Sequence, residues 1–173
     1  MEDIDHSITL YWSIASQPSR SVKSLLLAGQ VPHNTVNIDL LKGEHLQEAF
    51  KKVNPRCMIP FIKDNDFGLS ESNSILKYLC NTNPSIPEYY WPKDDQTRAL
   101  TDQYLEFYQF HFRPALIGPL RLRMGKVMGR PFSEAAMDEA LANLYASLDT
   151  FELMLARHAG AFLVNDKPTI ADL

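Results

Sequence analysis

The sequence predicts two domains: an α+β domain built on a mixed four-stranded sheet, and an all-α helical domain that follows it. In residues 1–82, strand and helix patterns follow each other in the order β-α-β, short helix, β-β-α. Residues 83–95 hold three prolines in quick succession, which is typical of a linker. From residue 96 onward the apolar positions repeat with a helical period, and this helical domain, residues 96–173, is expected to be incomplete.

The first three elements form a strand, a helix and a second strand. Apolar side chains at every second position of residues 8–12 predict a half-buried strand. Ser16 followed two positions later by Pro18 is a helix start, because serine is favoured at the N-cap and proline in the first turn. The alternation of Val36, Ile38 and Leu40 predicts the second strand. A strand, helix and strand of these lengths imply a parallel pair.

The stretch from Val53 to Leu79 completes the first domain. It follows a short amphipathic helix that begins after Gly43. Residues 59–69 read as strand, turn and strand, and Pro60 belongs at a sheet edge, a bulge or a cis bond because it lacks a backbone donor. One face of the next helix is then formed by Ser72, Ile75, Leu76 and Leu79.

The helical domain contains two long helices. The first presents one face made of Leu100, Tyr104, Phe107 and His111. Pro114 and Pro119 are expected to kink or end it. Ser133 begins the second, whose packing seam is Met137, Leu141, Leu144, Leu148, Phe151 and Leu155. Thr169 and Asp172 form a capping box at the start of a third helix, yet the sequence stops at Leu173, which is why the domain is expected to be incomplete.

Composition excludes several classes of protein. A net charge of −4 and a pI near 5.7 give no electrostatic footprint for nucleic acid. No apolar run approaches the length of a membrane span, and the acidic start is not typical of a signal or transit peptide. Cys57 and Cys80 have no close-spaced partner, so we expect no metal site and a reduced, cytoplasmic environment.

The order of elements, with a proline opening the third strand, resembles the thioredoxin fold. Redox members of that fold carry Cys-x-x-Cys in the loop after the first strand, where this chain has Ser16 to Ser19. Two hydroxyls cannot exchange disulfides, so thiol–disulfide chemistry at this loop is excluded. The whole chain is similar to the theta class of cytosolic glutathione S-transferases. The residues that carry this resemblance are SQPSR at 16–20, DLLKGEH at 39–45, Asn54-Pro55, Ile59-Pro60, SES at 70–72 and TIADL at 169–173.

The resemblance implies a glutathione site in the first domain and a catalytic role for Ser16. As a bare sequence feature Ser16 is a plain N-cap. In the family, the hydroxyl at this position hydrogen-bonds the sulfur of glutathione and favours the thiolate, which is the nucleophile. Arg20, one turn later, is either an electrostatic support for the site or a solvated arginine.

The remaining substrate-binding residues are also implied by the family. Glu71 and Ser72 would hold the ammonium and carboxylate of the γ-glutamyl end, and Ile59, followed by a cis Pro60, would pair with the cysteinyl peptide through its backbone. At the glycyl end the family assigns a contact to the positions of His45 and Met58. Many relatives have lysine where this chain has Met58, so weaker binding of the glycyl end is expected. Without the resemblance, His45 reads as a surface residue and the Glu71-Ser72 pair as helix caps.

The expected reaction is attack of the glutathione thiolate on small hydrophobic electrophiles: halides, epoxides or organic hydroperoxides. Reduced glutathione is a co-substrate, and no other cofactor is expected; the family also implies a homodimer. Most members of an aromatic set are expected to pack in the core, and one or two from the long helix to face the electrophile pocket; the set is Tyr11, Trp12, Phe107, Tyr108, Phe110 and His111. Two alternatives are a non-catalytic scaffold with this fold and a narrow glutathione-dependent dehalogenase or peroxidase.

Overall fold

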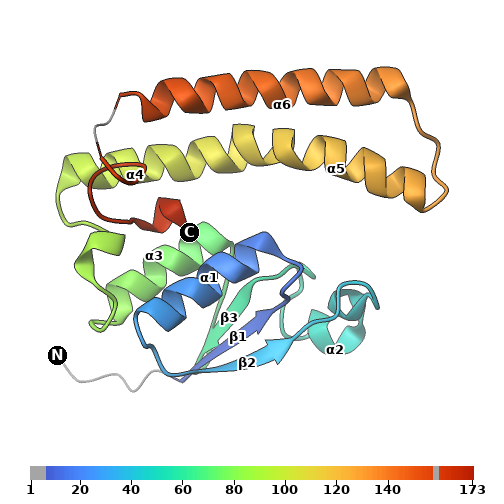
Figure 1. The fold of residues 1–173 in the computed structure, drawn as a ribbon. Helices are drawn as coiled ribbons and strands as arrows, with labels where there is room; N and C mark the ends of the chain where they lie inside the picture. The colour runs from blue at the N-terminus through green and yellow to red at the C-terminus, as the bar shows by residue number, and fades with distance from the viewer. Residues whose placement is uncertain (1–6, 158–159) are drawn as a thin grey trace. The chain divides into compact units, whose positions relative to one another are not determined.

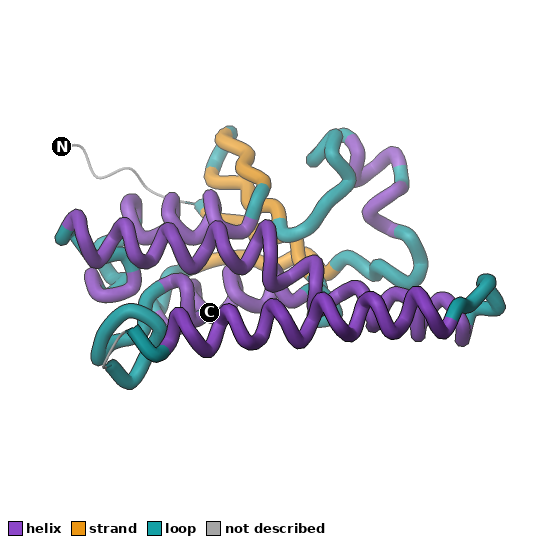
Figure 2. Tube along the Cα trace, turned by 90° about the horizontal axis from the view of Figure 1, so that it is seen from above, coloured by secondary structure: helices purple, strands orange, loops and turns teal. Residues whose placement is uncertain are grey.

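The computed structural model describes residues 7–157 and 160–173, which form two compact units. The first comprises the residues up to Pro92 together with Leu173, and the second runs from Lys93 to Asp172. All four strands, orange in Figure 2, belong to the first unit, and the described elements of the second unit are helical. The predicted combination of a mixed sheet with a helical portion is confirmed.

The sheet of the first unit has the strand order β2-β1-β3-β4. Its strands are β1 (Ile8–Trp12), β2 (His33–Asn37), β3 (Phe61–Asp64) and β4 (Phe67–Ser70). As predicted, β2 runs parallel to β1, while β3 is antiparallel to both β1 and β4. The register sets Tyr11 opposite Phe61, and Phe61 opposite Ser70.

Two helices pack side by side on one face of this sheet, α1 (Gln17–Ala28) and α3 (Ser72–Thr82), as Figure 1 shows. The fully buried apolar side chains of the first unit come from these helices and from the two central strands: Ile8, Leu10, Val22, Leu25, Leu26, Ile62, Ile75 and Leu79. The 3-10 helix η1 (Glu44–Leu46) and the short α2 (Glu48–Lys51) lie in the connection between β2 and β3. The helix predicted from Ser72 is therefore present with its expected buried face.

The second strand differs from its prediction. It spans His33–Asn37, so Leu40 lies outside it, and Val36 is 39% exposed. Ile38 follows the strand and is buried, with its N–H donating to the Trp12 carbonyl at 2.8 Å. Within the part of the chain that the structure describes, β2 is an edge strand paired only with β1, so few of its side chains are covered. The alternation of apolar residues therefore did not mark the ends of β2.

The proline-rich segment 83–95 packs in part on the first unit. Ile86 is buried against the end of α1, where a Cβ at Gly29 would lie 2.4 Å from the Ile86 Cγ1 atom. The 3-10 helix η2 (Glu88–Tyr90) follows, and the Lys77 ammonium lies 5.3 Å from the Trp91 ring centroid. The last residues of the segment begin the second unit, where Asp94 caps α4 by accepting from the Thr97 N–H at 2.8 Å.

The second unit is built from two long antiparallel helical runs. The first is continuous through α4 (Asp95–Phe107), the π-helix η3 (Tyr108–Phe112) and α5 (Arg113–Val127), and α6 (Glu134–Leu155) packs beside α5. Ser133 caps α6 as predicted, accepting from the Ala136 N–H at 3.3 Å. The rings of Phe107, Phe112 and Phe151 stack between the two runs with centroids 5.0–6.3 Å apart.

The two prolines of the first run do not end it. The backbone widens to π geometry just before Pro114, with the Arg113 N–H donating to the carbonyl of Tyr108 five residues earlier. A wider turn accommodates a residue that lacks a backbone donor, so the helix changes type instead of stopping. Pro119 is accommodated inside α5. The prediction that these prolines end the helix is therefore wrong, because the run continues through a local π segment.

Candidate functional site

Ser16 lies at the N-cap of α1, at the end of the loop that follows β1. Its Oγ accepts a 3.4 Å hydrogen bond from the Ser19 N–H, and its side chain is almost fully buried. Arg20 fixes the same loop by donating from its guanidinium to the Ile14 carbonyl at 2.7 Å. This contact gives Arg20 a structural role that the sequence did not identify.

The loop that follows β2 carries His45. Asp39 organises this loop, because its carboxylate accepts from the N–H groups of Leu41 and Lys42 at 2.9 and 3.1 Å. These bonds, chiefly that from Lys42, lower the pKa of Asp39. Gly43 adopts a left-handed backbone with φ +68°, which glycine tolerates, and Glu44 accepts from the Asp39 N–H at 2.7 Å. His45 follows, and its Nδ1 atom is buried without a partner among the residues that the structure describes.

The loop before β3 is held by Asn54, whose side chain is 2% exposed. Its amide donates to the Met58 carbonyl at 2.7 Å, and its Oδ1 accepts from the Arg56 N–H at 3.1 Å. Met58 itself is largely exposed. The Ile59–Pro60 peptide bond is cis, and Pro60 is buried immediately before the first residue of β3.

Glu71 is the N-cap of α3, and Ser72 is the first helical residue. Glu71 has a left-handed backbone with φ +71°, and it makes no capping bond with its side chain. Its carboxylate instead forms an ion pair with Arg56, between Oε1 and Nη1. The first N–H groups of a helix have no partner inside it, so the start of α3 offers donors for an anion.

The register of the sheet places all four of these loops at one end of it. Trp12 ends β1, and Asn37, which ends the parallel β2, lies opposite it. The antiparallel β3 begins beside the end of β1, and β4 ends beside the start of β3. The predicted site residues therefore lie in the connections, or at the helix start, that leave one end of the sheet: Ser16, His45, Met58, Ile59, Pro60, Glu71 and Ser72.

Contacts join some of these residues directly. The Arg56–Glu71 ion pair connects the loop before β3 to the start of α3, and the Ser70 hydroxyl lies 3.5 Å from the Asn54 Oδ1. Ser16 and His45 are positioned by contacts within their own loops. Sequence reasoning missed Arg56. The available signal was that this cation stands two residues before Met58, in the loop where relatives were expected to carry a lysine.

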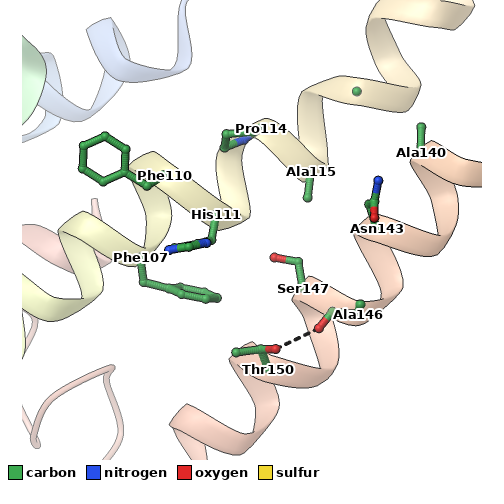
Figure 3. A pocket seen from close by; sticks show the side chains of 11 residues that line it. Phe107, Phe110, His111, Pro114, Ala115, Ala140, Asn143, Ala146, Ser147 and Thr150 are labelled. Carbon is green, nitrogen blue, oxygen red and sulfur yellow. Dashed lines mark hydrogen bonds between the residues drawn. The ribbon is translucent and has the colours of Figure 1, made fainter.

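The second unit contains a separate pocket of about 500 Å³ between its two helical runs. Three of the predicted aromatic residues, Phe107, Phe110 and His111, line one side, and α6 contributes small and polar side chains on the other, among them Asn143, Ser147 and Thr150 (Figure 3). The Thr150 hydroxyl donates a 2.9 Å hydrogen bond to the Ala146 carbonyl. Of the other predicted aromatics, Tyr11 packs in the first unit against Phe50 and Phe61.

Residues 7–157 and 160–173 contain neither a candidate metal site nor a helix that could span a membrane. In these ranges no three histidine, cysteine, aspartate or glutamate side chains gather where a metal ion could be held. Within the same ranges, no helix has the length and apolar character needed to cross a membrane.

Comparisons with known proteins give consistent matches. A family model described as the N-terminal domain of glutathione S-transferases matches residues 10–87. The human glutathione S-transferase theta-1 is 34% identical over 96% of this chain and 69% of its own length. Among solved structures, the apo form of human glutathione-S-transferase T1-1 superposes with a TM-score of 0.85, at 35% identity, over 96% of this chain and 70% of that one.

A third comparison concerns a liganded structure. Human glutathione transferase theta-2, solved in complex with glutathione and an unknown ligand, superposes with a TM-score of 0.86 at 28% identity. The match covers 95% of this chain and 68% of that chain.

Proposed function

Because this chain belongs to the theta-class glutathione S-transferases, we propose that it activates glutathione through the Ser16 hydroxyl for attack on small electrophiles. The observation that carries the proposal is the position of Ser16, a nearly buried hydroxyl at the start of α1, at the end of the sheet where the other predicted glutathione contacts emerge.

The geometry of Ser16 suits a hydrogen-bond donor. Its oxygen accepts from the Ser19 N–H, which leaves the hydroxyl hydrogen available for a ligand sulfur. Donation to a thiolate, together with the positive end of the α1 dipole, favours ionisation of the thiol. Each unit by which the thiol pKa falls corresponds to about 1.4 kcal/mol. Ser16 forms no covalent bond in this mechanism, and glutathione is the only co-substrate that it requires.

The remaining site residues would hold the three parts of glutathione. Glu71 takes the γ-glutamyl ammonium, while Ser72 and the free N–H groups at the start of α3 take the neighbouring carboxylate. The Ile59 backbone pairs with the cysteinyl unit, next to Pro60. At the glycyl end, His45 brings a ring nitrogen that is buried without a partner among the described residues, and Met58 brings an uncharged side chain.

The electrophile is proposed only by class, as a small halide, epoxide or organic hydroperoxide, since no residue of the described chain selects among them. A homodimer and a cytoplasmic location also remain proposals from the family. The competing function is a scaffold without catalysis. The presence of Ser16, Glu71 and Ser72 favours the enzyme, because a scaffold that does not use glutathione has no need for all three side chains.

The test is glutathione binding by calorimetry, combined with a conjugation panel of halides, epoxides and hydroperoxides. Wild type is expected to bind glutathione and to conjugate several electrophiles, and Ser16→Ala to bind but to lose most turnover. Ser19→Ala is the matched control, because it removes a buried hydroxyl one turn away and keeps the N–H that bonds Ser16. Turnover of one substrate alone would favour the narrow specialist, and binding without any turnover would favour the scaffold.

A further inference from the structure

The two oxygens of the Glu71 carboxylate have different surroundings. Oε1 accepts a hydrogen bond from the Arg56 guanidinium, within the ion pair. Among residues 7–157 and 160–173, no donor contacts Oε2. An ionised carboxylate accepts at both oxygens, so Glu71 can keep Arg56 and still receive an ammonium group. The ion pair therefore leaves Glu71 available to a ligand.

Arg56 also has N–H donors beyond the one that it gives to Glu71. It uses Nη1 for Glu71, and its guanidinium carries further N–H donors in the same plane. Its side chain is 63% exposed, so a ligand can reach these donors. Its backbone is fixed, since the Arg56 N–H donates to the buried Asn54 side chain. The Arg56 guanidinium is therefore exposed to a ligand while the Arg56 backbone is held in place.

The pair sits where an anion is already favoured. Glu71 immediately precedes the first turn of α3, whose N–H groups are not capped by its side chain. The Arg56 guanidinium held beside Glu71 offsets the negative charge of that carboxylate and brings further N–H donors to this helix start. The place therefore offers one free carboxylate oxygen for a cation, and guanidinium plus backbone donors for an anion.

We propose that Arg56 is a specificity-determining residue that binds the α-carboxylate of the γ-glutamyl group. This inference rests on the proposed function and deepens it. An α-amino-acid head carries an ammonium and a carboxylate on one carbon, and the Arg56–Glu71 pair presents the complementary charges side by side. The ammonium binds Glu71 Oε2 while the carboxylate binds Arg56 and the start of α3. The recognised chemistry is an α-amino acid in zwitterionic form.

The expected effect is moderate because the ion pair is exposed. Exposed charge pairs contribute little, so removal of Arg56 should weaken glutathione binding by about threefold to tenfold. The effect should shrink at high salt, because ions screen exposed charges. A buried cation would have given a larger and salt-insensitive loss.

The test measures dissociation constants of wild type and Arg56→Gln for three ligands. They are glutathione, γ-aminobutyryl-cysteinyl-glycine, which lacks the α-carboxylate, and glutathione amidated at the glycyl carboxylate. Lys51→Gln is the matched control, since it removes one cation from another exposed ion pair, that with Glu48. Arg56→Lys tests whether charge alone suffices.

The proposal expects Arg56→Gln to weaken glutathione and its glycyl amide by the same factor, and to leave the ligand without an α-carboxylate unchanged. Lys51→Gln should change none of the three. An equal loss for all ligands, a loss confined to ligands with a free glycyl carboxylate, or tighter binding by Arg56→Gln would overturn it; the last result would mean that Arg56 competes with the ligand for Glu71. If wild type itself fails to bind glutathione, the proposed function falls as well.

Discussion

The side-chain amide of Asn54 donates a 2.7 Å hydrogen bond to the carbonyl oxygen of Met58, closing the loop that leads into β3. The same side chain accepts from the Arg56 N–H and from the Ser70 hydroxyl. A single buried amide thus connects the loop before β3 with the end of β4, where Glu71 follows. Three proposed ligand contacts, at Met58, Ile59 and Glu71, depend on this connection.

Replacement of Asn54 by alanine should therefore harm both stability and ligand binding. It leaves the Met58 carbonyl and the Arg56 N–H without their partner, which is expected to lower the free energy of unfolding by about 1–3 kcal/mol. Denaturant unfolding measures the first effect and calorimetry with glutathione the second. Asn81→Ala, an exposed change on α3, is the control. Equal stability of the two variants would refute the role given to Asn54.

A buried carboxylate and a tyrosine make the stability of the first unit sensitive to alkaline pH. Burial, and then the 2.7 Å hydrogen bond to Asp64, raise the pKa of Tyr78 to about 12. Since the folded pKa lies above the ordinary value near 10, the stabilisation is fully present below pH 10 and is lost as the pH rises through 12.

Tyr78→Phe should accordingly cost about 1 kcal/mol of unfolding free energy at pH 7, and the difference from wild type should narrow above pH 10. Chemical denaturation at a series of pH values measures it. Burial also raises the pKa of the Cys80 thiol, to about 12, but this residue is present in both proteins and cancels in the difference. A gap that stays constant up to pH 11 would contradict the assignment.

The contact between Gly29 and Ile86 tests the packing of the proline-rich segment. An added Cβ at Gly29 would lie 2.4 Å from the Ile86 Cγ1 and 3.2 Å from its Cα, so Gly29→Ala is expected to destabilise by about 1–3 kcal/mol. Gly118→Ala is the control, because its Cβ would meet Ala140 at an ordinary 3.7 Å inside a helix. Thermal unfolding compares the two. If Gly29→Ala is as stable as wild type, Ile86 does not pack there.

Local signals in the sequence predicted much of this structure. The caps at Ser16 and Ser133 are formed as expected, because each depends only on residues within one turn. The capping box of Thr169 with Asp172 is formed in part: the Asp172 carboxylate accepts from the Thr169 N–H, but the Thr169 hydroxyl accepts from the Ala171 N–H and not from that of Asp172. The apolar face of α3 was equally readable, since burial on one side of a helix leaves a periodic pattern. The glutathione transferase family was identified from motifs spread along the chain, and its assignment is confirmed.

Other features depend on contacts between distant residues and left no readable pattern. The π segment before Pro114 is a change of backbone geometry that composition does not encode. The limits of β2 follow from its edge position, which exposes most of its side chains. The Arg56–Glu71 ion pair joins residues 15 positions apart and requires the β3–β4 hairpin to bring them together.

The most direct test of the account is the pKa of the glutathione thiol bound to wild type and to Ser16→Ala, followed through the ultraviolet absorbance of the thiolate. With the Ser16 hydroxyl as donor, the thiol bound to wild type ionises well below free glutathione, and the variant loses most of that shift while still binding. If both proteins bind glutathione and ionise it alike, Ser16 does not activate the thiol and the proposed mechanism is wrong.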